Sequence, residues 1–317
     1  MSSVLEIKNL SKSLGAKLIL NDISLEISSG EIYGFLGPNG SGKTTTIKLI
    51  LGLLEITHGE IRICGLDVKS NFENAIEQVG GIIENPEMYS YLTARENLEQ
   101  YARMYQKEIN TERIDEVLSF VGLAAHADEK ISRFSLGMKQ RLGVAQAILH
   151  KPKLLVLDEP TNGLDPAGIK DLRDLLKRLC KEEGLAVFVS SHLLSELELL
   201  CDRVGIINHG KIVGDRSLEE LRRETEAGLS SVEIVAENAE NAKAVLERGG
   251  YSAELCGEKL SVKITRDEIP EAISELVRAG ERIFGVSFVQ RSLEDAFLEM
   301  TTDLRSDYNK KKEVKYD

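Results

Sequence analysis

A glycine-rich segment at residues 37–45 constrains the fold of this chain more than any other feature. It reads Gly-Pro-Asn-Gly-Ser-Gly-Lys-Thr-Thr and fits the phosphate-binding pattern G-x-x-x-x-G-K-[ST] without a gap. An apolar run at 32–36 precedes it and a helical pattern at 44–51 follows, which is the strand–loop–helix context that such a loop requires. We therefore expect an α/β core that binds phosphate at a helix N-terminus.

The residue types of this loop predict how phosphate is held. Glycines let backbone N–H groups close on phosphate oxygens. We expect Lys43 to reach the β- and γ-phosphates of a nucleotide and Thr44 to give its hydroxyl to Mg²⁺. The loop residues assigned to nucleotide binding are Gly37, Pro38, Asn39, Gly40, Ser41, Gly42, Lys43, Thr44 and Thr45. A chance glycine-rich turn is the competing interpretation, and it leaves the flanking strand and helix unexplained.

Composition narrows the possible partners. The chain has 317 residues and a formal net charge of −12. At about 150 residues per domain, this length predicts two domains. The acidic balance and the absence of Trp argue against a nucleic-acid partner. The four cysteines lack metal-like spacing and fit reduced thiols in a cytosolic protein. No apolar run approaches the roughly 18 residues of a membrane span, so a membrane role requires another polypeptide.

Alternating apolar and helical patterns divide the chain. Residues 1–217 predict an α/β domain, and residues 94–150 carry helical patterns without a convincing strand, which predicts a helical subdomain. Strands are expected at residues 4–7, 24–27, 32–36, 79–83, 154–157, 186–190 and 204–207. Besides the helix after the glycine-rich loop, helices are expected at residues 94–107, 111–121, 139–149 and 169–180.

The pattern changes after residue 217. A charged helix at 217–225 is expected to lead into a second, α+β domain at 218–303, with a flexible tail at 304–317. Strands at 232–236, 252–255, 260–264 and 283–289, with helices at 239–248 and 268–279, follow the β-α-β-β-α-β order of a ferredoxin-like unit. A closing helix is expected at 293–300.

Two adjacent carboxylates end an apolar strand in the first domain. Asp158 and Glu159 follow the run Leu154-Leu-Val-Leu. At the carboxyl edge of a parallel sheet, Asp158 is placed to hold Mg²⁺ through its hydration shell. Glu159 is then placed to orient the attacking water and take its proton. Adjacent acidic residues also occur at strand ends by chance, but a phosphate loop in the same domain favours the functional interpretation.

A third motif precedes that strand. The sequence Phe134-Ser-Leu-Gly-Met-Lys-Gln-Arg141 opens a strong helical pattern, and Ser135 is a suitable N-cap. The helix N-terminus, the Ser135 hydroxyl and the Gly137 amide together suit a γ-phosphate held by a different subunit. A simple helix cap remains an equally good interpretation of these residues taken alone.

The order of these motifs resembles that of the ATP-binding-cassette (ABC) ATPases over residues 1–215. The phosphate loop, the signature Ser135–Gln140, the strand ending in Asp158-Glu159, the segment Asn162-Gly-Leu-Asp165 and His192 follow one another in the family order. The resemblance implies a P-loop ATPase fold, with ATP and Mg²⁺ bound between two copies in a head-to-tail dimer. It makes Asp165 an aspartate at the dimer seam and His192 a contact of the γ-phosphate.

Two positions depart from the commonest family pattern. Leu14 occupies the slot of an adenine-stacking aromatic, so weaker discrimination between bases is expected. Glu84 stands where most members carry Gln, and it is assigned a catalytic and metal-sensing role, in which its carboxylate adds negative charge near the metal. Glu84 and the signature Ser-Leu-Gly-Met-Lys-Gln are similar to exporters for bacitracin resistance and lantibiotic immunity. The C-terminal Ser292-Leu-Glu-Asp-Ala-Phe297 resembles the wider antibiotic-exporter group.

The resemblance implies the ATPase subunit of an exporter at the cytoplasmic face of the cell membrane. Integral membrane permease subunits would carry the antimicrobial peptide, antibiotic or other amphiphilic compound, and residues 84–96 with the helical block would meet them. The alternatives are a non-transport ABC protein that remodels ribosomes or DNA, and a regulatory ATP-binding module. The exported compound, the choice between homodimer and heterodimer, and the role of the C-terminal domain stay open at this point.

Overall fold

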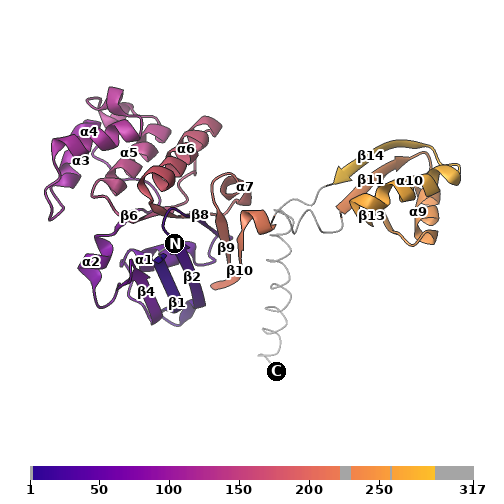
Figure 1. Cartoon of the computed structure of the whole chain (residues 1–317), viewed down its shortest axis with the longest axis horizontal. Helices are drawn as coiled ribbons and strands as arrows, with labels where there is room; N and C mark the ends of the chain where they lie inside the picture. The colour runs from indigo at the N-terminus through magenta and orange to yellow at the C-terminus, as the bar shows by residue number, and fades with distance from the viewer. Residues whose placement is uncertain (1–2, 222–229, 258, 290–317) are drawn as a thin grey trace. The chain divides into compact units, whose positions relative to one another are not determined.

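The chain forms two compact units, which divide after Leu218 (Figure 1). The computed structural model describes residues 3–221, 230–257 and 259–289. The division lies one residue from the domain boundary expected between residues 217 and 218. None of the helices in the described ranges is long and apolar enough to cross a lipid bilayer.

The first unit is built on a six-stranded sheet with the order β10-β9-β3-β8-β7-β6. Every neighbouring pair from β9 to β6 is parallel, and β10 alone runs antiparallel to β9. The strands are β3 (Ile32–Leu36), β6 (Val79–Ile82), β7 (Leu154–Asp158), β8 (Ala186–Ser191), β9 (Arg203–Asn208) and β10 (Lys211–Ser217). The central strands β3, β7 and β8 are buried throughout, as their unbroken apolar runs predict.

A second, antiparallel sheet has the order β2-β1-β4-β5. The strands expected at 4–7 and 24–27 are parts of the longer β1 (Ser3–Leu14) and β2 (Lys17–Ser28). Register shifts and positive φ angles at Asn9 and Asp22 interrupt the alternation of these strands, which is why their full length was not expected. The short strands β4 (His58–Ile63) and β5 (Leu66–Asp67) were not expected either.

Helix α1 (Lys43–Ile50) contacts β2 of one sheet and β7 of the other, so the main core lies around it. Helix α2 (Phe72–Ile76) packs on β4, β5 and β6. Helix α6 (Pro166–Glu183) packs on β8, and the short α7 (Leu194–Leu197) packs on β3 and β8. Observed α1 and α6 correspond to the helices expected at 44–51 and 169–180.

The helical block is confirmed, because residues 94–150 contain no strand. It comprises α3 (Ala94–Ala102), α4 (Thr111–Phe120), two 3₁₀ turns (Ala124–His126 and Ile131–Arg133) and α5 (Leu136–Ile148). Helix α3 is shorter than the helix expected at 94–107, since residues 103–110 are not helical. Thr93 begins α3 with a capping box, in which the Glu96 side chain returns to the N-cap amide.

The second unit has a four-stranded antiparallel sheet with the order β12-β13-β11-β14. Its elements are β11 (Ser230–Ala236), α9 (Ala239–Arg248), β12 (Ser252–Cys256), β13 (Lys259–Ile264), a 3₁₀ turn (Arg266–Glu268), α10 (Ile269–Arg278) and β14 (Ile283–Val289). The expected order of strands and helices is therefore observed, and a separate apolar core joins the sheet to α9 and α10. The ferredoxin-like assignment stays a prediction. The closing helix at 293–300, the tail at 304–317 and residues 222–225 of the helix expected at 217–225 lie outside the described residues.

Candidate functional site

The central sheet brings the phosphate loop, the Asp158-Glu159 pair and His192 to one edge. Strands β3, β7 and β8 are parallel, so their carboxyl ends lie together. In the register of these strands, Leu36 pairs with Ser191 and Asp158 pairs with Ser190. The phosphate loop leaves β3 at this edge and enters α1 at Lys43. Residues far apart in the sequence therefore meet beside one helix N-terminus.

The backbone of the phosphate loop requires glycine. Gly40 and Gly42 have positive φ angles of 79° and 117°. A Cβ atom at Gly37 would lie 2.4 Å from the carbonyl oxygen of Ile207, which leaves no room for a side chain. The buried Lys43 Nζ donates to the carbonyl oxygen of Gly37 at 2.8 Å, so the lysine folds back over the loop. The loop has the compact shape expected of a phosphate cradle.

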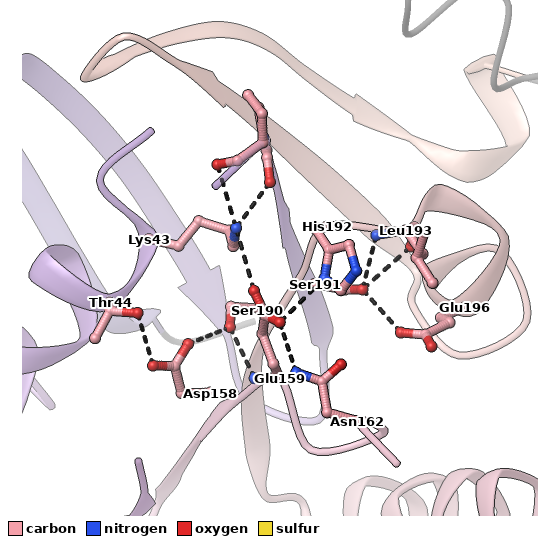
Figure 2. Close-up of polar contacts among 12 residues, drawn as sticks. Lys43, Thr44, Asp158, Glu159, Asn162, Ser190, Ser191, His192, Leu193 and Glu196 are labelled. Carbon is pink, nitrogen blue, oxygen red and sulfur yellow. Dashed lines mark hydrogen bonds and ion pairs between the residues drawn. The ribbon is translucent and has the colours of Figure 1, made fainter. Parts of the chain in front are cut away.

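Thr44, Asp158 and Ser190 form a line of hydrogen bonds (Figure 2). Thr44 Oγ1 donates to Asp158 Oδ2 at 2.9 Å, and Ser190 Oγ donates to Asp158 Oδ1 at 2.6 Å. The Ser190 hydroxyl also accepts from the backbone N–H of Glu159 at 2.9 Å. The carboxylate and hydroxyl oxygens of Asp158 and Thr44 are the hard ligands that Mg²⁺ prefers, and one or two protein ligands suffice when phosphates supply others. The side chains of Thr44 and Asp158 therefore suit Mg²⁺ as ligands.

Glu159 is held at the centre of a second cluster (Figure 2). Its Oε2 atom lies 3.0 Å from His192 Nδ1 and accepts from Asn162 Nδ2 at 2.7 Å. Its Oε1 atom lies 3.3 Å from Lys43 Nζ. Burial raises the pKa of the Glu159 carboxyl, but the Asn162 hydrogen bond and the Lys43 charge outweigh burial and hold that pKa below its ordinary value. The carboxylate is therefore charged and oriented, as a base that takes a proton from water must be.

Ser135, Gly137 and Asp165 form a different group. Ser135 caps α5 by accepting from the Met138 N–H at 3.2 Å, which confirms the predicted N-cap. Asp165 caps α6 by accepting from the Gly168 N–H at 2.9 Å. A Cβ atom at Gly137 would lie 3.9 Å from the Gly168 Cα, so the two helix N-termini are neighbours. No hydrogen bond or ion pair in the described part of the chain joins this group to the phosphate loop.

Leu14 and Glu84 also stand apart from the clusters. Leu14 ends β1 at the tip of the hairpin with β2, and its side chain is 47% exposed. Glu84 lies two residues beyond the end of β6, is exposed, and has a positive φ of 60°. Within the described ranges, the Glu84 side chain makes no hydrogen bond or ion pair with the Asp158 cluster. Glu84 shares the carboxyl edge of the sheet with the predicted metal ligands.

Ser190 and Asn162 are part of the site although sequence reasoning gave them no role. Ser190 pairs with Asp158 across adjacent strands, and Asn162 lies on the turn after Glu159. The available signal was a polar residue at the carboxyl end of an apolar strand, next to a predicted site residue. This signal could have identified Ser190. It could not have identified Asn162, because the direction of that side chain depends on the backbone of the turn after Glu159.

Comparisons with known proteins agree with the geometry. Residues 20–162 match the family described as ABC transporter. The chain is 38% identical over 303 residues to the bacitracin transport ATP-binding protein BcrA of Enterococcus faecalis, a span that covers 94% of this chain and 96% of that protein. It is 42% identical over 224 residues to the lantibiotic transport ATP-binding protein SrtF of Streptococcus pyogenes, with 69% and 95% covered. The solved structure of an ATP-binding subunit of an ABC transporter matches with a TM-score of 0.62 at 33% identity, covering 70% of this chain and 92% of that one.

These similarities confirm the predicted α/β ATPase core and the predicted family. They include the bacitracin and lantibiotic subgroup that Glu84 and the signature sequence had indicated. The similarity to BcrA runs over nearly the whole of both chains. In the structure of this chain, the phosphate loop, Asp158-Glu159 and His192 lie at one edge of the central sheet. The chain belongs to the ATP-binding proteins of the ABC transporter family.

Proposed function

We propose that this protein hydrolyses ATP to power export of an antimicrobial peptide, or of an antibiotic or other amphiphilic compound, through separate membrane subunits. The observation that carries the proposal is the Lys43–Glu159–His192 cluster beside the Thr44–Asp158 pair. It places a charged base, a cation and two metal-ligand oxygens at one helix N-terminus. The names of the bacitracin and lantibiotic relatives support the class of compound.

The chain's own residues divide the work of hydrolysis. The loop N–H groups and the Lys43 ammonium bind phosphate oxygens, and ATP would replace the present contacts of Lys43 with Gly37 and Glu159. Thr44 and Asp158 would hold Mg²⁺. When bound, this ion would neutralise part of the negative charge on the phosphates. Glu159 orients water and takes its proton. His192, whose Nδ1 lies 3.0 Å from Glu159 Oε2, would contact the γ-phosphate.

A second copy of the chain would complete the site. Within the described ranges, no hydrogen bond or ion pair joins the helix N-terminus at Ser135 and Gly137 to the phosphate loop of the same chain, although both belong to the predicted nucleotide site. A head-to-tail pair would place Ser135 and Gly137 of one copy against the nucleotide of the other, with Asp165 at the seam. The adjoining N-termini of α5 and α6 support this arrangement, because both present positive ends to an anion.

Glu84 suits the contact between the ATPase and its membrane partner. Its exposed side chain lies at the sheet edge that carries the catalytic cluster, and residues 84–96 lead into α3 of the helical block. In this proposal Glu84 senses the metal only when nucleotide and partner are both in place. The protein then works at the cytoplasmic face of the cell membrane, held there by the membrane subunits.

Resistance of living cells tests the proposal. The chain and its membrane partner are expressed together in a sensitive bacterium, and the inhibitory concentrations of bacitracin and of a lantibiotic are measured. Wild type should raise at least one of them, and Glu159→Gln should abolish the protection. The matched control is Glu183→Gln, an exposed carboxylate at the end of α6. Equal protection by the Glu159→Gln variant would overturn the proposal, and no protection by wild type would rule out bacitracin and the tested lantibiotic as its substrates.

A further inference from the structure

One carboxylate outside the predicted site binds two hydroxyl groups beside it. Glu196 lies on α7, and its Oε2 atom accepts from Thr161 Oγ1 at 2.6 Å and from Ser191 Oγ at 2.8 Å. Figure 2 shows Glu196 reaching Ser191 next to the Glu159–His192 pair. Bonds from hydroxyls to a charged oxygen at these distances are short and strong.

The two hydroxyls belong to the segments that carry the catalytic pair. Thr161 follows Glu159 by two residues, and Ser191 directly precedes His192. The Ser191 oxygen also accepts from the Leu193 N–H at 3.0 Å, so it fixes the backbone on both sides of His192. A hydroxyl has one proton, and the competing acceptor, the Leu193 carbonyl, is more distant at 3.3 Å. Donation to Glu196 therefore sets the orientation of the Ser191 hydroxyl.

The position of Glu196 is itself fixed by packing. Leu194 and Leu197 of α7 are buried, and a Cβ at Gly34 of β3 would lie 3.1 Å from the Leu197 Cδ1. Thr161 and Ser191 are buried as well. Removal of the carboxylate would leave two buried hydroxyls without their charged acceptor, so the segments of Glu159 and His192 would lose their shared anchor.

We propose that Glu196 is a positioning residue, which sets the geometry between Glu159 and His192 by holding the hydroxyls of Thr161 and Ser191. Among the residues that the structure describes, no hydrogen bond or ion pair joins Glu196 to the phosphate loop or to the predicted metal ligands, so we expect its effect to run through these two neighbours. The inference rests on the ATPase chemistry proposed above. In this proposal, the short helix α7 holds Glu159 and His192 in their relative positions.

The first test separates turnover from binding. In the purified full-length protein, Glu196→Ala should lower kcat by about tenfold or more, because small displacements of catalytic groups are costly. The Kd for ATP should stay within about twofold of wild type, since the phosphate loop is untouched. Glu196→Gln keeps an acceptor oxygen and should recover most of the rate. Glu183→Ala is the matched control and should leave kcat unchanged.

The second test asks whether Glu196 acts through the hydroxyls. In a Thr161→Val, Ser191→Ala background, Glu196→Ala should cause little further loss of kcat, because its two partners are already gone. A full additional loss would overturn the proposal, and so would a Glu196→Ala enzyme with wild-type kcat. A Glu196→Ala variant that unfolds at lower temperature and loses ATP binding in the same proportion would show a merely structural role. If wild type itself does not hydrolyse ATP, the proposed function fails instead.

Discussion

The charge on Glu159 depends on three neighbouring side chains. Asn162 donates to its carboxylate, and Lys43 and His192 lie within ion-pair distance. These contacts favour the charged form, so they hold the carboxyl pKa below its ordinary value despite burial. A low pKa keeps Glu159 charged at neutral pH, so the proposed base should be lost as pH falls through the pKa of this carboxyl in the folded protein.

Asn162→Ala is therefore expected to shift the acid limb of the ATPase pH profile to higher pH. Without the amide donor, the Glu159 carboxyl binds a proton more readily, and the active charged form is lost sooner on acidification. The measurement is kcat/KM against pH for the purified protein, because this quantity reports the pKa of the nucleotide-free form. Asn74→Ala, on the exposed surface of α2, is the control and should leave the limb in place. An unmoved or downward-shifted limb in Asn162→Ala would contradict this account of the Glu159 charge.

Leu14→Tyr is expected to tighten ATP binding. The hairpin that carries Leu14 runs beside the phosphate loop, because Leu20 Cδ2 lies 2.5 Å from where a Gly42 Cβ would be. A ring stacked on the base adds about 0.5–1.5 kcal/mol, or up to about tenfold in affinity. Titration of ATP and GTP against wild type and Leu14→Tyr measures the change in affinity. Leu53→Tyr is the control, because Leu53 is another exposed leucine. Unchanged affinity for both nucleotides in Leu14→Tyr would refute base stacking at this position.

Local sequence patterns predicted some site residues and missed others for a definable reason. Lys43, Thr44 and Glu159 could be assigned to the candidate site from sequence because loop and strand-end motifs position them by local geometry alone. Ser190 and Glu196 act across strand β8 and helix α7, so their roles depend on tertiary register. A serine at a strand end or a glutamate on a short helix carries no local sign of such a partner.

At the scale of elements, the start of α1 is the most constrained position. Gly42 is the N-cap of α1 with φ 117°, and a Cβ there would lie 2.5 Å from Leu20 Cδ2. Gly42→Ala combines a backbone strain of about 1–3 kcal/mol with that clash, so ATP affinity should fall at least about tenfold. Gly65→Ala, at the turn between β4 and β5, also has a positive φ, of 79°, but open space around it, so it is the control and should leave affinity nearly unchanged. Equal ATP affinities in the two variants would contradict the claim that the phosphate loop requires glycine at position 42.

The elements of the central sheet were easier to predict than those of the flanking sheet. Strands β3, β7 and β8 are short and wholly buried, so an unbroken apolar run marks each of them. Strands β1 and β2 change register at several points, and their exposed residues hide the period of two. Prediction from sequence therefore succeeded for the strands that carry the candidate site. It missed the full length of β1 and β2 in the antiparallel sheet.

At the scale of the whole molecule, the two units each have their own core. The described hydrogen bonds and ion pairs of Lys43, Thr44, Asp158, Glu159 and His192 all lie in the first unit. A chain shortened to residues 1–221 should therefore still fold and bind ATP. At a concentration of 100 Kd, ATP should stabilise it by about 2.7 kcal/mol, as it does the full chain. Thermal unfolding with and without ATP measures this. A shortened chain that folds but shows no stabilisation by ATP would contradict the assignment of the site to one unit.

The central claim is that Glu159 is the base of an ATPase whose phosphate loop binds independently of it. Steady-state ATP turnover by the purified wild type and the Glu159→Gln variant tests this claim most directly, with ATP affinity measured alongside. The substitution keeps the shape and removes the charge, so kcat should fall by about 10²–10⁴-fold. The Kd for ATP should remain close to that of wild type. Turnover in the variant equal to wild type would contradict the account.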